Sequence, residues 1–402
     1  MITVAEAEQI VLAEKRDYGT ETVTLEQSNG RVLAEAIFAD RDFPPYDRIT
    51  MDGIAIAYKI FEQRLRKFRV KGTQAAGDKP IEITTTEECV EVMTGASLPV
   101  SVDTVIRYED VTIENGLATV NIDNIRQGQN IHRKGSDKTE GTLLVKEGKM
   151  ITPALINTAA SVGKSELLVK KLPKVIVISN GDELVAVDEM PAPYQVRRSN
   201  SHAIAAILQQ HGIVADMVHL PDDEAVIKNK LENLLQQYDI IILSGGVSMG
   251  KYDYLPKVFD ELHVEKKFHK VKQRPGKPFW FGTSDNGKIV FAFPGNPVSA
   301  FMCMHRYFIP WLHASLSIET KPPVYAVLKE DYTFSPELQY FLQVKIHSEA
   351  DGRLMAVPAE GNGSGDFINL LDTEAFMELP EKQTNFKQGE AYRIWPYKQI
   401  VL

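Results

Sequence analysis

Residues 238–248 read Tyr-Asp-Ile-Ile-Ile-Leu-Ser-Gly-Gly-Val-Ser, and this stretch decides the fold. Its short apolar run is typical of a strand buried in a parallel sheet, and the serine and glycines that follow predict a loop at the strand's carboxyl end. Ligands of open α/β sheets bind at that edge, where glycine lets backbone N–H groups approach an anion. We therefore expect a phosphate-bearing or oxyanionic ligand at Ser244, Gly245, Gly246 and Ser248, although the Gly-Lys-Ser/Thr ending of a Walker loop is absent.

The segments around this stretch alternate between strand and helix patterns. Strands are predicted at 175–178, 214–220 and 240–243, and helices at 199–210 and 224–237. Repeated strand–helix–strand units of this length imply a parallel sheet that is covered on both faces.

Another helix is predicted after the third strand. Asn296 followed by Pro297 is a good pair of cap and first-turn residues, and the helix is expected to run to about Ile309, where Pro310 would end it.

The rest of the chain carries mainly β patterns. An amphipathic helix is predicted over residues 3–15, with Thr3 as its cap and Glu6 three residues later. From Gly53 to about Asn130, alternating apolar residues and glycine-containing turns predict a small β domain inserted into an outer unit. After residue 321 short strands and glycine-rich turns return.

Length and composition limit the classes of protein. The 402 residues predict two to four domains. A net charge of −9 argues against non-specific nucleic-acid binding. The two cysteines, Cys89 and Cys303, exclude a disulfide framework and a thiolate metal cage, and Cys303 is expected in the core. With neither a membrane-length apolar run nor an export signal, a cytoplasmic enzyme that binds no membrane is expected.

Several carboxylates stand beside predicted strand ends. Asp182 and Glu183 follow the first strand of the α/β region, where a carboxylate can hold Mg²⁺ against phosphate oxygens; a solvated turn is the alternative. Asp222 and Asp223 start a predicted helix, where acidic residues are usually caps. Asp253 lies close to the Gly-Gly turn, so both a cap and a ligand or metal role fit its position.

Residues 274–278 read Arg-Pro-Gly-Lys-Pro and place two cations on a rigid turn. Such stiffness orients donors in advance for a tetrahedral oxyanion, and an ordinary exposed basic turn is the alternative. Asp52 and Asp137 flank the predicted β domain, where spacing alone favours simple turn aspartates. The nine histidines show no helical pair spacing and no Gly-x-Ser-x-Gly elbow occurs, which argues against a zinc site and a hydrolase triad.

Several segments together carry a family resemblance: Thr50-Met51-Asp52-Gly53-Ile54-Ala55, Met93-Thr94-Gly95-Ala96, Arg133-Lys134-Gly135-Ser136-Asp137, Ser179-Asn180-Gly181-Asp182-Glu183-Leu184, Ser199-Asn200-Ser201, Ser244 to Gly250 with Asp253, Pro275-Gly276-Lys277-Pro278 and Pro294-Gly295-Asn296-Pro297-Val298-Ser299. In this order and spacing they are specific, and they span essentially the whole chain. The chain resembles the molybdopterin molybdenumtransferase family, whose eukaryotic relatives include the gephyrin E domain.

The resemblance implies a multidomain α/β plus β fold. Its four domains would be a discontinuous outer and dimerisation domain (1–42 and 134–171), an inserted β domain (43–133), a central parallel-sheet α/β domain like molybdopterin adenylyltransferase (172–318) and a C-terminal β-barrel-like domain (319–402). It also implies a homodimer whose active cleft lies between the α/β domain of one subunit and the inserted domain of the other. An upstream adenylyltransferase and apo-molybdoenzymes are the further partners that it suggests.

The family takes adenylylated molybdopterin and molybdate, cleaves the phosphoanhydride with Mg²⁺, places molybdenum on the dithiolene sulfurs and releases AMP. Carried onto this chain, the resemblance assigns the positioning of Mg²⁺, nucleotide or water to Glu183, Asp222 or Asp223, and Asp253. It implies that Asp52, Thr94 and Asp137 contribute to the cleft from the partner subunit. It also implies that Arg274, Lys277 and Ser364 contact molybdate or the pterin phosphate. The expected catalytic set is Asp52, Asp137, Glu183, Asp253 and Lys277, and the other expected substrate-binding residues are Ser244, Gly245, Gly246, Ser248, Pro294, Gly295 and Asn296.

Two positions depart from the family pattern. Arg274 stands where many members carry lysine, and Gln343 stands where many carry arginine, which would remove one charge from the molybdate site. Two other functions share parts of the pattern: the preceding adenylyl transfer from ATP to molybdopterin, and a non-enzymatic scaffold like gephyrin in animals. The added domains argue against the first, and the lack of a long linker or fused domain argues against the second. Molybdate and tungstate are not distinguished by the sequence.

Overall fold

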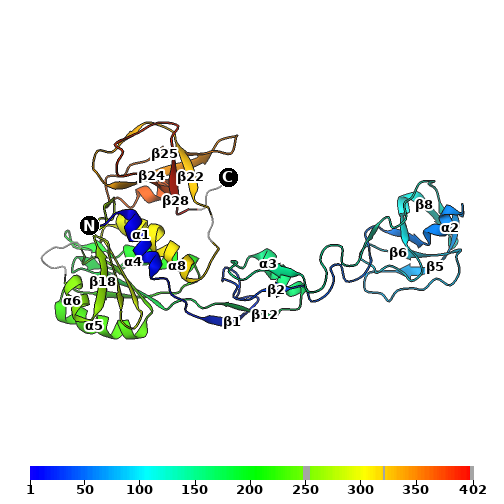
Figure 1. Ribbon diagram of the computed structural model, residues 1–402, viewed down its shortest axis with the longest axis horizontal. Coiled ribbons are helices and arrows are strands. Elements are labelled where there is room, and N and C mark those ends of the chain that lie inside the picture. The colour runs from blue at the N-terminus through cyan, green and yellow to red at the C-terminus, as the bar shows by residue number, and fades with distance from the viewer. Residues whose placement is uncertain (248–253, 320–321, 399–402) are drawn as a thin grey trace. The chain divides into compact units, whose positions relative to one another are not determined.

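The chain divides into two compact units in a computed structural model that describes residues 1–247, 254–319 and 322–398 (Figure 1). Unit 1 comprises Met1–Ala34, Gly148–Thr152 and Leu167–Leu402, and unit 2 comprises Glu35–Glu147 and Pro153–Glu166. In the described part of the chain, no helix combines the length and apolar character needed to cross a membrane.

The centre of unit 1 is a six-stranded sheet with the order β16-β13-β17-β21-β20-β18. Its strands are β13 (Val175–Asn180), β16 (Asp216–Leu220), β17 (Ile240–Ser244), β18 (Val264–His269), β20 (Trp280–Ser284) and β21 (Ile289–Phe293). The first four in the order are parallel, which confirms the predicted parallel sheet. At the other edge, β20 pairs antiparallel with β21, to which a short turn joins it as a hairpin, and β18 pairs antiparallel with β20.

Helices cover both faces of this sheet, as predicted (Figure 1). Successive side chains of a strand point to opposite faces, so Val175 and Val177 enter one core and Ile176 and Ile178 enter the other. The first core is covered by α1 (Val4–Ala13), α4 (Asn200–Gln210), α7 (Pro297–Cys303) and α8 (Ile309–Ser315). The second is covered by α5 (Glu224–Gln237) and α6 (Leu255–Glu261).

One sequence prediction for the helices of the first core is confirmed and another is wrong. The capping box at α1 is confirmed, because Thr3 and Glu6 exchange hydrogen bonds. The prediction that Pro310 ends the helix beginning at Pro297 is wrong, since α8 continues to Ser315. A π-helical segment, Met304–Phe308, precedes Pro310, and its wider turn accommodates a residue that lacks an N–H.

The C-terminal part of unit 1 is a closed β-barrel. Its strands are β22 (Val324–Leu328), β24 (Gln339–Ser348), β25 (Leu354–Pro358), β26 (Ala375–Leu379) and β28 (Ala391–Pro396). The pairing of β24 with β26 closes the ring, which confirms the predicted barrel-like domain. The short strand β19 (Gln273–Arg274) pairs with β24, so a loop of the α/β layer joins the barrel's sheet.

Unit 2 contains a separate six-stranded sheet with the order β7-β4-β6-β5-β9-β8, as expected for an inserted β domain. Its strands are β4 (Gly53–Ile56), β5 (Lys67–Gln74), β6 (Glu88–Val92), β7 (Thr104–Arg107), β8 (Val111–Glu114) and β9 (Leu117–Val120). The same unit holds α2 (Tyr58–Glu62), α3 (Pro153–Ser161) and two short strand pairs, β2 (Ile37–Phe38) with β11 (Leu143–Val145) and β3 (Arg48–Ile49) with β10 (Ile131–His132).

Candidate functional site: a cleft at the carboxyl edge of the central sheet

A cleft of about 1330 Å³ opens in unit 1 at the carboxyl edge of the parallel strands. The strand register brings the ends of β13, β17 and β21 together, because Ser179 pairs with Ser244 and Ser244 with Phe293. The remaining walls come from residues 195–201, the basic turn at 273–278 and residues 360–367 of the C-terminal domain. The cleft therefore lies where the sequence placed the ligand-binding edge.

The Gly-Gly loop has a backbone that only glycine adopts without strain. Gly245 and Gly246 have φ angles of 104° and 73°. A Cβ on Gly245 would lie 2.7 Å from the backbone oxygen of Asn180, and one on Gly246 would lie 2.4 Å from its Oδ1. The two glycines thus bring the loop against the end of β13 and leave its backbone open to the cleft. Ser248, also predicted here, lies outside the described residues.

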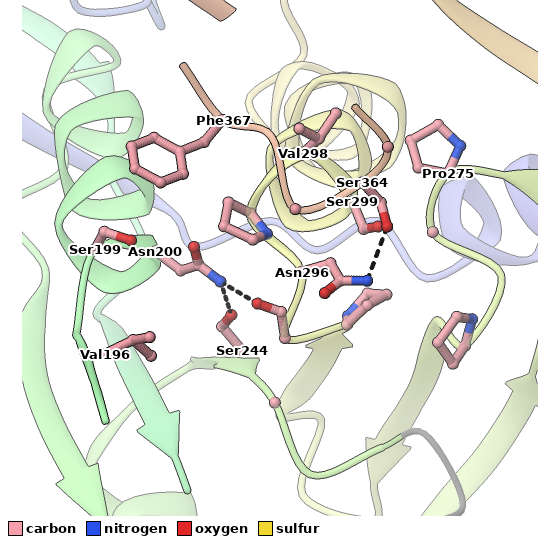
Figure 2. Close-up of a pocket in the computed structure, with 18 of the residues that line it drawn as sticks. Val196, Ser199, Asn200, Ser244, Pro275, Asn296, Val298, Ser299, Ser364 and Phe367 are labelled. Atoms are coloured by element: carbon pink, nitrogen blue, oxygen red, sulfur yellow. Dashed lines mark hydrogen bonds between the residues drawn. The ribbon is translucent and has the colours of Figure 1, made fainter. Parts of the chain in front are cut away.

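Two asparagines connect the loops around the cleft (Figure 2). At the start of α4, Asn200 Nδ2 donates to Ser244 Oγ at 2.9 Å and to the backbone oxygen of Gly295 at 2.7 Å. Asn296 occupies the N-cap of α7, but its side chain makes no capping bond, so that part of the prediction is wrong. Its Nδ2 instead donates to Ser364 Oγ at 2.8 Å, which brings the predicted Ser364 to the cleft.

The predicted carboxylates of the α/β domain separate into cleft and cap residues. Glu183 and Asp222 line the cleft. The Asp182 and Asp222 side chains accept from each other's backbone N–H at 3.0 and 3.3 Å, which fixes the two loops together. Asp223 caps α5 and accepts from the N–H of Val226 at 2.9 Å. Asp253 lies outside the described residues.

The basic turn presents both predicted cations to the cleft. Arg274 and Lys277 are exposed and line it, together with Pro275 and Gly276. Neither cation forms an ion pair with an acidic side chain among residues 1–247, 254–319 and 322–398, whereas many other lysines and arginines of the protein do. Their charge is therefore available to an anionic ligand.

A buried polar network supports this turn on the side that faces the core. The sequence did not predict it. Gln273 and Tyr307 are at most 1% exposed. The Tyr307 hydroxyl donates to Gln273 Oε1, and Gln273 Nε2 donates to the backbone oxygen of Gly276 at 2.9 Å. A Cβ on Gly276 would lie 2.9 Å from Cys303 Sγ, so the turn packs directly on the core. Tyr307 belongs to the π-helical segment, and no local sequence signal relates it to a residue 34 positions earlier.

Removing the Tyr307 hydroxyl is expected to destabilise this network. Tyr307→Phe keeps the packing but leaves Gln273 Oε1 buried without a donor, which should lower the free energy of unfolding by about 1–3 kcal/mol. Urea unfolding measures the change. The exposed Tyr325 is the matched control, and Tyr325→Phe should unfold like the wild type. Unfolding of Tyr307→Phe at the wild-type urea concentration would contradict the role given to the network.

The three site residues predicted in unit 2 belong to two separate hydrogen-bonded pairs. Asp52 Oδ1 accepts from the backbone N–H and the hydroxyl of Thr94 at 2.6 and 2.7 Å, and these two bonds lower the pKa of Asp52. Asp137 Oδ1 lies 2.8 Å from His132 Nε2. Asp52 and Thr94 therefore form one polar pair, between the residue just before β4 and the turn after β6, and Asp137 forms another pair with His132, five positions earlier.

The protein is of the multidomain α/β plus β class, with a cleft at the carboxyl edge of its α/β sheet that residues of a β-barrel domain also line. Three family models match the chain: the MoeA N-terminal region (domain I and II) at residues 2–163, a probable molybdopterin binding domain at 176–314, and the MoeA C-terminal region (domain IV) at 325–397. The chain belongs to the molybdopterin molybdenumtransferase family.

Individual relatives match over nearly the full length. A molybdopterin molybdenumtransferase from Synechocystis is 39% identical over 99% of this chain and 100% of its own. One from Staphylococcus aureus strain MRSA252 is 30% identical over 98% of this chain and 95% of its own. The solved structure of a molybdopterin biosynthesis MoeA protein from Pyrococcus horikoshii aligns over 99% of both chains with a TM-score of 0.84 at 30% identity.

Proposed function

We propose that this chain inserts molybdenum from molybdate into adenylylated molybdopterin and releases AMP. The observation that carries the proposal is the cleft itself, because it combines carboxylates that follow two strand ends with two cations on a rigid turn that form no ion pair within the described part of the chain. Such a pair of regions suits a ligand with a phosphate-bearing end and a separate incoming oxyanion.

The carboxylates fit the magnesium that this reaction requires. Within the described part of the chain, no group of three or more metal-binding side chains gathers in one place. Mg²⁺ is usually held by one or two carboxylates together with phosphate oxygens and water, so Glu183 and Asp222 are a sufficient protein contribution. When bound, the ion would neutralise charge on the anhydride phosphates. Glu183 and Asp222 would orient it, and the Gly245-Gly246 backbone would position the phosphates.

In the proposed reaction, water adds to a phosphorus of the anhydride and the bridging P–O bond breaks. AMP then leaves with one phosphate, and the pterin retains the other. The two dithiolene sulfurs bond to molybdenum, and one molybdate oxygen leaves as water with both thiol protons. Lys277 and Arg274 would hold the oxyanion near the sulfurs by charge-assisted hydrogen bonds. Molybdate and tungstate have the same charge and nearly the same size, so both fit this role.

The test is to incubate the purified protein with adenylylated molybdopterin, Mg²⁺ and molybdate, and to follow AMP release and activation of an apo-molybdoenzyme. We expect AMP release that depends on molybdate. Its absence would reject the proposal. Formation of the adenylylated product from ATP and molybdopterin would instead favour the preceding adenylyl transfer, and binding of partners with neither reaction would favour a scaffold.

We further propose that the working form is a homodimer in which Asp52, Thr94 and Asp137 complete the cleft of the partner subunit. The resemblance to the family supports this arrangement, as does the Thr94-held carboxylate of Asp52, which is exposed and ionised and so suits contact with a metal-bound substrate.

A heterodimer of two inactive variants tests this arrangement. At a low molybdate concentration, Asp52→Ala and Lys277→Ala would each leave their homodimers almost inactive, but a co-expressed heterodimer purified through two different tags should recover part of the activity. One of its two clefts then receives both Asp52 and Lys277 unchanged. A heterodimer as inactive as its parents, or a monomer in analytical ultracentrifugation, would contradict the shared cleft.

A further inference from the structure

The C-terminal wall of the cleft carries a carboxylate whose orientation is fixed by two tyrosines. Tyr332 and Tyr340 both donate their hydroxyl groups to Glu360 Oε1, the second at 3.0 Å. The Tyr340 ring stacks on Phe334 with a centroid distance of 4.1 Å and an interplanar angle of 6°. Glu360 and Tyr340 line the cleft. One carboxylate oxygen is therefore held by the protein, which leaves Oε2 without a hydrogen bond to the described residues.

The two tyrosines are permanent donors. Burial raises the pKa of Tyr340 to about 12, and burial together with the bond to Glu360 raises that of Tyr332 further. Both phenols therefore stay protonated at neutral pH, and Glu360 accepts from them throughout. Glu360 forms no ion pair with a cation of residues 1–247, 254–319 or 322–398, although Arg274 lies opposite Tyr340 in the β19–β24 pairing.

Gln343 adds a buried donor to the same wall. The residue is 8% exposed and lines the cleft, and its Nε2 has no hydrogen-bond partner within the described part of the chain. The N–H of Ala359, the residue before Glu360, donates to the backbone oxygen of Gln343 at 3.0 Å. The free amide donor lies on β24, and the held carboxylate lies just after β25, the strand that pairs with β24. Both belong to one wall of the cleft, and a buried N–H without a partner calls for an acceptor from a ligand.

This combination does not suit an oxyanion, because the Glu360 carboxylate repels negative charge. It suits a flat heterocycle that carries neighbouring N–H donors and a carbonyl acceptor on one edge. A pterin has such an edge: its 2-amino group and N3–H are donors, and its 4-oxo group is an acceptor. The wall also adjoins the basic turn through β19, next to the place proposed for the dithiolene and molybdate.

We propose that Glu360 accepts from the 2-amino and N3–H groups of the substrate's pterin ring while the Gln343 amide donates to its 4-oxo group. This inference rests on the function proposed above and specifies which part of the substrate the barrel domain recognises. Tyr332 and Tyr340 are positioning residues, since they act through Glu360.

Binding of a free pterin tests the assignment without catalysis. The probe is 6-hydroxymethylpterin, and the comparison probe is 6-hydroxymethyllumazine, in which oxygen replaces the 2-amino group. Calorimetric titration of the wild type should show tighter binding of the pterin. Glu360→Gln should weaken pterin binding about tenfold to a hundredfold, because it removes a charge-assisted contact, and should change lumazine binding much less. The control Glu349→Gln alters a carboxylate of the same domain that pairs with Lys329 outside the cleft.

Each result decides the matter. Loss of pterin preference in Glu360→Gln with unchanged AMP affinity supports the subsite. Wild-type pterin affinity in that variant, equal affinity of the wild type for the two probes, or no pterin binding at all would overturn it. If Glu360→Gln fails to fold, the comparison of the two probes on the wild type remains decisive. Selective pterin binding without molybdate-dependent AMP release would reject the proposed reaction and keep the subsite. Molybdate-dependent AMP release without selective pterin binding would support the reaction and reject the subsite.

Discussion

Glu183→Gln is expected to lower the rate of AMP release by about 100-fold or more, because it removes one of the two carboxylate charges proposed to hold Mg²⁺ against the anhydride phosphates. The Glu183 side chain lies in the cleft against Gly181, where an added Cβ would be 2.3 Å from Glu183 Oε2. The substitution keeps the shape of the side chain, so the fold should persist. A discontinuous AMP assay at saturating molybdate and Mg²⁺ measures the effect.

The matched control is Glu232→Gln, an exposed position on α5 that does not line the cleft. Its rate should equal that of the wild type. A second readout is the magnesium concentration that gives half the maximal rate, which should rise in Glu183→Gln and stay constant in the control. Wild-type AMP release by Glu183→Gln would remove this carboxylate from the mechanism.

Lys277→Ala is expected to raise the molybdate concentration needed for half-maximal AMP release by about tenfold to a hundredfold. The physical reason is that Lys277 carries a positive charge into the cleft with no acidic partner in the described part of the chain, so a bound dianion would be its main electrostatic contact. Binding of AMP alone should change little, because the nucleotide is assigned to the carboxylate region.

Lys266→Ala, an exposed lysine of β18 outside the cleft, is the control for a general loss of positive charge. Lys277→Arg should recover much of the molybdate response, since it restores the charge with a different geometry. An unchanged molybdate dependence in Lys277→Ala would show that the oxyanion binds elsewhere.

The sequence predicted the parts of this fold that local patterns determine. The apolar run of β17, its Gly-Gly ending and the strand–helix alternation led to the sheet and to its ligand edge, because buried parallel strands and positive-φ turns leave strong local signals. The two cations at Arg274 and Lys277 were likewise visible, and the structure places both on the cleft.

Contacts between distant segments were not predictable in this way. The Asn296 side chain appeared to be a helix cap, yet a serine 68 positions later takes its hydrogen bond. Pro310 appeared to end a helix, but the preceding π-helical turn accommodates it. Gln273 and Tyr307 belong to different elements, and only the packed fold brings their side chains together. Polar networks of this kind depend on tertiary geometry and leave no periodic signal in one sequence.

The most direct test of the central claim is a crystal structure of the protein with AMP, Mg²⁺ and molybdate, in which anomalous scattering locates molybdenum. We predict the AMP phosphate at the Gly245-Gly246 loop, with Mg²⁺ held by Glu183 and Asp222, and the oxyanion in contact with Lys277 in the same cleft. Molybdate and AMP in unrelated places, or an oxyanion that touches neither cation of the basic turn, would contradict the account.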